Sequence, residues 1–194
     1  MVFWRTDRQH GGQEGAMDIL LLGMGNILKT DDGLGVHAVR RLAEEGLEGA
    51  DLLELGASLV DSFFLLEAYD CIVALDAVHF GGKPGALCWL GREELARVGR
   101  AELSLHEGDL LDALDLAALR GKRPALYVAG MEPYDITSWG MELSSPVRAA
   151  LSAYLAMVRE KVHLLALSGK HGEGDGGGGE AEALRVCGEG RRFS

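Results

Sequence analysis

Short runs of consecutive apolar residues alternate along this chain with amphipathic segments, and this alternation restricts the possible fold more than any other feature. One run covers residues 19–22 and ends at Gly23, and another covers residues 71–75 and ends at Asp76. Such runs are typical of strands that are buried on both faces of a parallel sheet. Between them, residues 36–45 repeat apolar side chains at helical spacing. Strands that alternate with helices predict a mainly parallel sheet with helices on both faces.

Extended along the chain, the same pattern predicts about five strands and four helices. We expect strands over residues 19–23, 51–55, 71–75, 85–90 and 125–129, with the strand at 85–90 at an edge of the sheet. We expect helices over residues 36–45, 61–69, 109–120 and 145–167. The predicted fold class is therefore α/β, a mainly parallel twisted sheet of about five strands in a three-layer αβα arrangement.

The two ends of the chain differ in composition from its middle. Residues 1–16 are polar with no period, and we expect a flexible leader there. Residues 168–194 contain an unbroken glycine run at 176–179, and chain entropy opposes packed structure in such a segment, so we expect a flexible tail. Residues 17–167 then form a single α/β domain, which is long enough to bury a core.

Charge and cysteine content exclude several classes of protein. The formal net charge is −11 at pH 7, and the chain lacks the clustered Lys and Arg that bind nucleic acid. It also lacks an apolar run of the roughly 18 residues that a membrane helix needs. Its N-terminus has no apolar stretch long enough for a signal peptide. Cys71, Cys88 and Cys187 form no CxxC pair, which argues against a disulfide framework and a thiolate zinc site. We therefore expect a cytoplasmic protein without nucleic-acid or membrane partners.

The most informative loop runs from Gly23 to Gly35, between the first strand and the first helix. A dinucleotide fingerprint would place its third glycine where Leu28 stands, and no GK[ST] phosphate loop is present, so a nucleotide-binding function is disfavoured. The loop instead delivers two adjacent carboxylates, Asp31 and Asp32, to the start of a helix. One of them can cap that helix, which leaves the other for a different role.

Two further side chains of interest follow strands of the predicted sheet. Asp76 comes directly after the strand at 71–75, and His106 lies before the helix at 109–120. Because neighbouring parallel strands end at the same edge of a sheet, Asp32 and Asp76 are expected to come together there. Two carboxylates and one imidazole suit a divalent transition metal such as zinc or nickel. The residues alone leave open that neither side chain binds a metal. Asp76 could be a plain carboxylate at the end of a strand, and His106 could be an ordinary loop histidine.

A series of short motifs, in one order over about residues 17–160, points to a family. The motifs are Gly23-Met24-Gly25-Asn26, Asp31-Asp32-Gly33-Leu34-Gly35-Val36, Leu75-Asp76-Ala77, Lys83-Pro84-Gly85, Ser104-Leu105-His106, Gly130-Met131-Glu132-Pro133 and Leu143-Ser144-Ser145-Pro146-Val147. In these motifs the chain resembles the hydrogenase maturation proteases.

The resemblance implies an endopeptidase that trims the C-terminal extension from the large-subunit precursor of a nickel–iron hydrogenase after nickel insertion. It implies Asp32, Asp76 and His106 as metal ligands and catalytic residues, with nickel supplied by the substrate and zinc or cadmium able to substitute. The family more often has glutamate at the first position, so Asp32 is a shorter variant. The implied partner is the nickel-loaded precursor, and the implied state is a monomer. An alternative is a non-catalytic nickel-binding chaperone that uses the same ligands.

Overall fold

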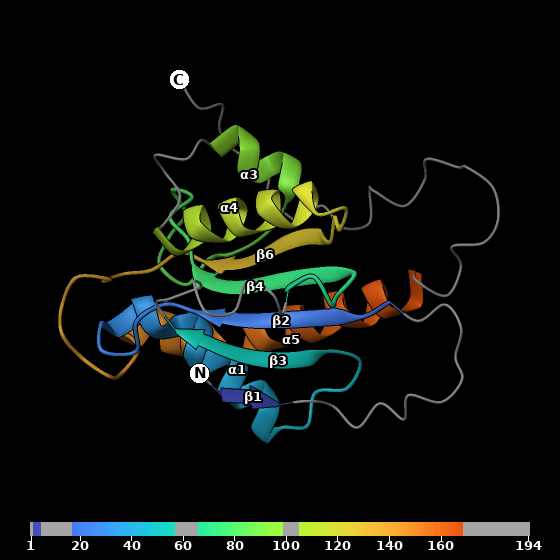
Figure 1. The fold of residues 1–194 in the computed structure, drawn as a ribbon. Helices are drawn as coiled ribbons and strands as arrows, with labels where there is room; N and C mark the ends of the chain where they lie inside the picture. Colours follow the sequence, from blue (N-terminus) through green and yellow to red (C-terminus); the bar gives the residue numbers. More distant parts are fainter. Residues whose placement is uncertain (1, 5–16, 57–65, 99–104, 169–194) are drawn as a thin grey trace.

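The computed structural model describes residues 2–4, 17–56, 66–98 and 105–168, without the side chains of residues 56, 96–98, 105–109, 113 and 116. Figure 1 shows the resulting α/β arrangement. In chain order its elements are β1 (Val2–Trp4), β2 (Ile19–Met24), η1 (Thr30–Gly33), α1 (Leu34–Glu44), β3 (Asp51–Gly56), β4 (Cys71–Ala77), β5 (Leu87–Gly91), α3 (Arg92–Val98), α4 (Leu105–Leu119), β6 (Ala125–Met131) and α5 (Ser145–Ser168).

The sheet has six strands in the order β1-β3-β2-β4-β6-β5. The four inner strands are parallel to one another, while β1 and β5 pair antiparallel at the two edges. This confirms the predicted α/β class and the mainly parallel sheet, including the edge position of the strand at 85–90. The sheet is mixed rather than purely parallel, and it has one strand more than expected.

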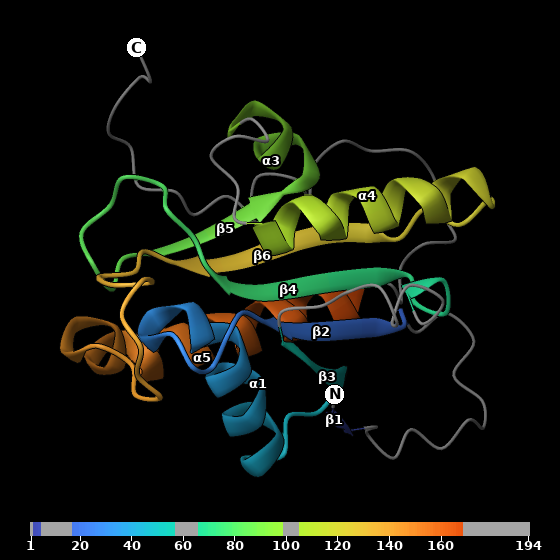
Figure 2. The same cartoon turned by 60° about the vertical axis from the view of Figure 1, so that its left-hand side comes forward.

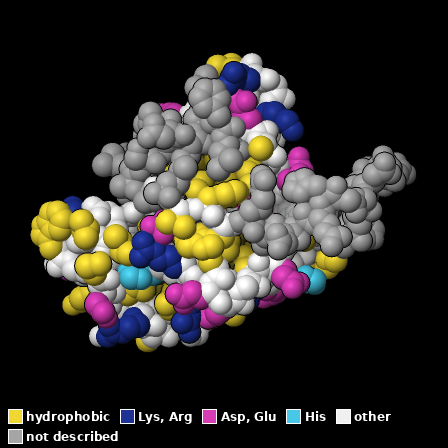
Figure 3. Space-filling model, turned by 60° about the horizontal axis from the view of Figure 1, so that its bottom comes forward, with side chains coloured by type: hydrophobic (Ala, Val, Ile, Leu, Met, Phe, Trp, Pro, Cys, Tyr) yellow, Lys and Arg dark blue, Asp and Glu magenta, His cyan; other side chains and the backbone are white. Residues whose placement is uncertain are grey.

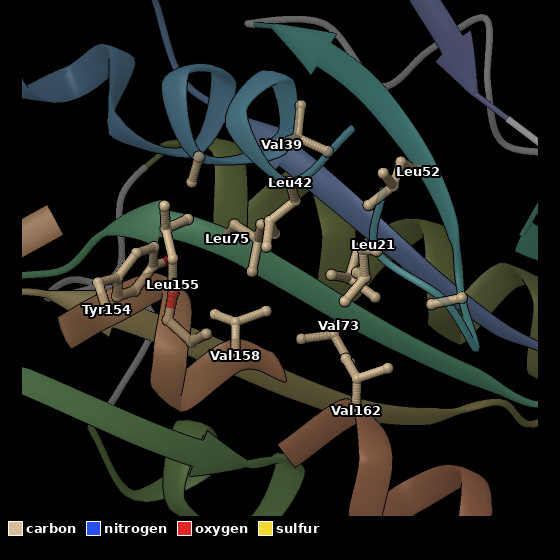
Figure 4. Close-up of a cluster of buried hydrophobic side chains, with 14 of the residues drawn as sticks. Leu21, Val39, Leu42, Leu52, Val73, Leu75, Tyr154, Leu155, Val158 and Val162 are labelled. Atoms are coloured by element: carbon tan, nitrogen blue, oxygen red, sulfur yellow. The ribbon is translucent and has the colours of Figure 1, made fainter. Parts of the chain in front are cut away.

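Helices cover both faces of the sheet, as Figures 1 and 2 show. Successive side chains of a strand point to opposite faces, and β2 and β4 are buried along their whole length, so each strand serves two cores. One core lies between the sheet and the pair α1 and α5, and Figure 4 shows Leu21, Val73 and Leu75 of the sheet facing Leu42 of α1 and Val158 of α5. The other core joins the opposite face to α3 and α4.

Several elements differ from the sequence-based expectation. The strand β1 lies within residues 1–16, for which no regular structure was expected. The helix α4 begins at Leu105, four residues before the predicted start, and α3 was not predicted. Most of the predicted helix at 61–69 lies outside the described residues, as do residues 5–16 and 169–194 of the proposed leader and tail.

The connection between α4 and β6 determines where α4 begins. Only residues 120–124 join the end of α4 to the start of β6. The 15 residues of α4 span about 22 Å, and the seven residues of β6 span about 23 Å. The helix therefore returns along the whole strand, and its first turn lies at the edge where β2, β4 and β6 end. Among the described helices, none combines the length and the apolar character needed to cross a bilayer.

Candidate active site

Asp31 is fully buried and links the loop after β2 to the loop after β6. One carboxylate oxygen, Oδ2, accepts hydrogen bonds from the backbone N–H groups of Tyr134 at 2.9 Å and Asp135 at 3.0 Å, and from the Ser144 hydroxyl at 2.8 Å. The other oxygen, Oδ1, accepts the Ser144 N–H at 2.7 Å. A buried carboxylate with four donors is satisfied by the protein itself. Asp31 thus has a structural role.

Asp32 is the neighbour of Asp31 in the chain, but it faces different surroundings. Both residues lie in the 3₁₀ turn η1, where successive side chains are rotated by about 120°. The Asp32 carboxylate is half-buried, and its Oδ2 accepts the Asn26 N–H at 2.9 Å. Neither acid caps α1, because its N-cap is Gly33 and no side chain bonds there. The capping role expected from the sequence is therefore wrong.

Asp76 is the next-to-last residue of the buried strand β4, and its side chain lies on the face of the sheet that α4 covers. Its side chain is 1% exposed, and its Oδ1 accepts the N–H of Ala77 at 2.8 Å. The residues two positions before and after it, Ala74 and Val78, belong to the core shared with Leu110 of α4. Since side chains alternate along a strand, Asp76 points to that same side of the sheet.

Gly25 lies between the backbone of Asp32 and the carboxylate of Asp76. Its φ is +107°, and a Cβ built on it would lie 1.7 Å from the backbone oxygen of Asp32 and 3.7 Å from Oδ1 of Asp76. Only glycine allows the backbone to pass this closely between the two residues. Asp32 and Asp76 are thus both neighbours of Gly25 at this edge of the sheet, Asp32 through its backbone and Asp76 through its carboxylate.

His106 lies in the first turn of α4, not before the helix as predicted. That turn lies at the edge of the sheet where β4 ends, on the face toward which the Asp76 side chain points. The His106 side chain lies outside the described residues, so two of the three predicted ligands can be placed by their side chains. Among the side chains that are described, no group of three His, Cys, Asp or Glu lies together as a metal site. The ligand set Asp32, Asp76 and His106 stays a prediction.

Sequence reasoning assigned no role to Glu132, which organises the loop after β4. Glu132 is 6% exposed. Its Oε2 accepts the N–H groups of Phe80 and Gly82 at 2.9 Å each, and its Oε1 lies 3.0 Å from Nδ1 of His79. The only sequence signal was its place in the motif Gly130-Met131-Glu132-Pro133. The carboxylate fixes the path of the chain just beyond Asp76.

A buried tyrosine and a half-buried histidine belong to α5 and α1, the two helices on the other face of the sheet. Tyr154 of α5 is fully buried, and its hydroxyl donates to the carbonyl oxygen of Ala129 at 2.6 Å. Burial, and then the negative charge of Asp76, raise the pKa of Tyr154. His37 of α1 hydrogen-bonds to the Met141 backbone, and burial is the main cause that lowers its pKa. Its Nε2 is buried and has no hydrogen-bond partner among the described residues.

Together, the fold and this edge define an α/β protein whose polar side chains gather beyond the carboxyl ends of parallel strands, where such sheets place their sites. The family model of the hydrogenase maturation protease HycI matches residues 36–161. The hydrogenase expression/formation protein HupM of Azotobacter chroococcum mcd 1 is 35% identical over 144 residues, covering 72% of this chain and 69% of that relative. HoxM of Azotobacter vinelandii is 35% identical over 149 residues, covering 75% and 72%.

Solved structures agree with these relatives. The hydrogenase maturating endopeptidase HybD from E. coli superposes with a TM-score of 0.68 at 26% identity, covering 76% of this chain and 93% of that chain. The [NiFe] hydrogenase maturation protease HybD from Thermococcus kodakarensis superposes with a TM-score of 0.63 at 32% identity, covering 75% and 99%. This chain belongs to the hydrogenase maturation protease family, and it is an endopeptidase.

Proposed function

We propose that this chain is a metal-dependent endopeptidase that removes the C-terminal extension of a nickel–iron hydrogenase large-subunit precursor after nickel insertion. The observation that carries the proposal is that Asp32 and Asp76 both lie next to Gly25 at the carboxyl edge of the sheet. The chain acts as a monomer in the cytoplasm, where it meets the nickel-loaded precursor.

The donor set fits a divalent transition metal. Each carboxylate is oriented by a backbone N–H, that of Asn26 for Asp32 and that of Ala77 for Asp76. Such hydrogen bonds hold ligands in place before an ion arrives. His106 would add an imidazole from the start of α4, which gives the mixed oxygen and nitrogen ligands that suit nickel or zinc, and cadmium as a substitute.

The metal in this proposal arrives with the substrate, as nickel already inserted into the precursor. A divalent ion polarises a peptide carbonyl and lowers the pKa of a bound water. The role of Asp32 and Asp76 is to bind and orient the precursor's metal centre against the bond to be cut. Buried Asp76 keeps its carboxylate in one position, while half-buried Asp32 is the side reached from solvent.

The test is cleavage of a nickel-loaded large-subunit precursor by the wild-type chain and by Asp32→Asn, Asp76→Asn and His106→Ala. We expect each variant to lose about a hundredfold in rate, since losing even the group that orients a metal ligand costs roughly 10- to 100-fold. Asp32→Glu, the residue more usual in the family, should retain activity. The matched control is Glu44→Gln, which neutralises an exposed carboxylate of α1.

Three outcomes would contradict the proposal. Full activity in all three ligand variants would exclude the metal site. Cleavage of a nickel-free precursor at the same rate would exclude the dependence on nickel insertion. Tight binding of the precursor without cleavage, under conditions where a relative cuts it, would favour the non-catalytic nickel-binding chaperone.

A further inference from the structure

Beside the candidate site, the loop between β6 and α5 exposes large apolar side chains. Tyr134 is 70% exposed, Trp139 77% and Met141 63%, and Leu28, at 48%, lies on the neighbouring loop after β2. We call these four residues the apolar patch. Figure 3 shows hydrophobic side chains gathered at the left end of the view, where this loop lies. Single exposed apolar residues are normal, whereas the largest exposed apolar group on a protein surface is often functional.

The backbone beneath the apolar patch is firmly held although the side chains are exposed. Gly140 donates its N–H to the Leu28 carbonyl at 3.0 Å, and its own carbonyl accepts the Thr30 N–H at 2.8 Å. The Thr30 hydroxyl donates to the Asp135 carbonyl at 2.6 Å. The Asp135 carboxylate in turn accepts the N–H groups of Thr137 and Ser138. Since the loop is already ordered, a partner that binds it incurs little ordering cost.

The apolar patch is joined to the candidate site by consecutive residues. Asp31 holds the loop of the apolar patch through the N–H groups of Tyr134 and Asp135, and the next residue is the predicted ligand Asp32. On the other side of Asp31, the Nζ of Lys29 lies over the Trp139 ring, 5.8 Å from its centroid. A polypeptide that reaches Asp32 along this side therefore crosses the apolar patch.

We propose that the apolar patch binds an extended, apolar segment of the large-subunit precursor next to the bond that is cut. This proposal rests on the proposed function. The four side chains expose on the order of 500 Å². A stable protein–protein interface buries roughly 800 Å² on each partner. The area thus falls short of a stable dimer of this chain, but it suits one peptide segment seated on aromatic side chains.

The test measures binding and cleavage separately, with the nickel-loaded precursor as the probe. Trp139→Ala and Tyr134→Ala are compared with Leu119→Ala, which removes an 84% exposed side chain at the far end of α4. We expect each patch variant to weaken precursor binding by roughly tenfold or more, as loss of an interface aromatic does. KM should rise by a similar factor while kcat changes little, and Leu119→Ala should match wild type in both.

The outcomes separate this proposal from the proposed function. Precursor binding that depends on Trp139, without cleavage by the wild-type chain, would support the docking surface and overturn the protease assignment for this precursor. Cleavage with unchanged Kd and KM in both patch variants would overturn the docking surface alone. An equal loss of precursor affinity in Leu119→Ala would overturn the docking surface, because the effect would not be specific to the apolar patch. If the wild-type chain self-associates, and Trp139→Ala loses this self-association without losing precursor affinity, the apolar patch binds a second copy of the chain instead.

Discussion

Asp31 and Asp32 are adjacent in sequence, yet their carboxylates belong to different parts of the molecule. Asp31 is buried and accepts four hydrogen bonds from the loop between β6 and α5, while Asp32 is half-buried beside Gly25 and Asp76. The turn η1 separates them by rotating successive side chains away from each other. The acidic pair thus divides into one residue that stabilises the loop and one that is available to the site.

The first prediction follows from this division. Asp31→Ala should lower the free energy of unfolding by about 3 kcal/mol, because it leaves the partly buried donors of Tyr134, Asp135 and Ser144 without their acceptor. Asp32→Ala should lower it by less than Asp31→Ala does, because Asp32 is half-buried and the hydrogen bond it accepts from Asn26 is only partly buried. Urea denaturation measures both values. Equal losses in the two variants would show that the roles are not divided in this way.

A second prediction concerns the close approach at Gly25. In Gly25→Ala the new methyl group would meet the Asp32 backbone oxygen, and the strained φ would remain, so the variant should be destabilised by more than about 3 kcal/mol. Gly46→Ala is the matched control, because its φ is also positive, at +68°, but no atom lies within 4 Å of the added carbon. The control should cost about 1 kcal/mol. A similar cost for both, by urea denaturation, would rule out the crowding.

A third prediction is a pH dependence of stability that arises from His37. Burial lowers its pKa below 6.5, so below that pH the unfolded chain binds a proton that the folded chain does not. The free energy of unfolding should therefore fall as the pH drops from 7.5 to 5.5. His37→Gln should make this fall smaller, whereas His163→Gln, which changes an exposed histidine of α5, should leave it as in wild type. Identical pH profiles for wild type and His37→Gln would contradict the assignment.

A fourth prediction concerns the buried thiols. Burial raises the pKa of Cys71 to about 12, so at pH 8 only about one such thiol in ten thousand is ionised. Cys88 is likewise a buried thiol that forms no disulfide among the described residues. In a Cys187→Ser variant, a thiol-reactive dye should therefore label the native chain at pH 8 only after denaturant is added. Rapid labelling without denaturant would mean that β4, which carries Cys71, or β5, which carries Cys88, opens readily in the native chain.

The strands could be predicted from the sequence because continuous apolar runs such as residues 71–75 leave few other choices. The position of Asp32 and Asp76 at one edge of the sheet could also be predicted, because neighbouring parallel strands end at the same edge. The different roles of Asp31 and Asp32 could not be predicted, since they depend on hydrogen-bond donors more than a hundred positions away in the sequence, such as Ser144. The strand β1 was missed because three exposed or half-exposed residues, Val2–Trp4, carry no recognisable pattern.

The two edge strands have a consequence for the behaviour of the chain at high concentration. A parallel sheet of continuous apolar strands that ended at β3 and β6 would offer two long rows of unpaired N–H and C=O groups to other copies. Here β1, with three residues, and β5, with five, occupy those positions in the antiparallel sense. Short edge strands are poor templates for cross-β growth. The fold therefore covers the otherwise open edges of β3 and β6, and it keeps the fully buried strands β2 and β4 in the middle of the sheet.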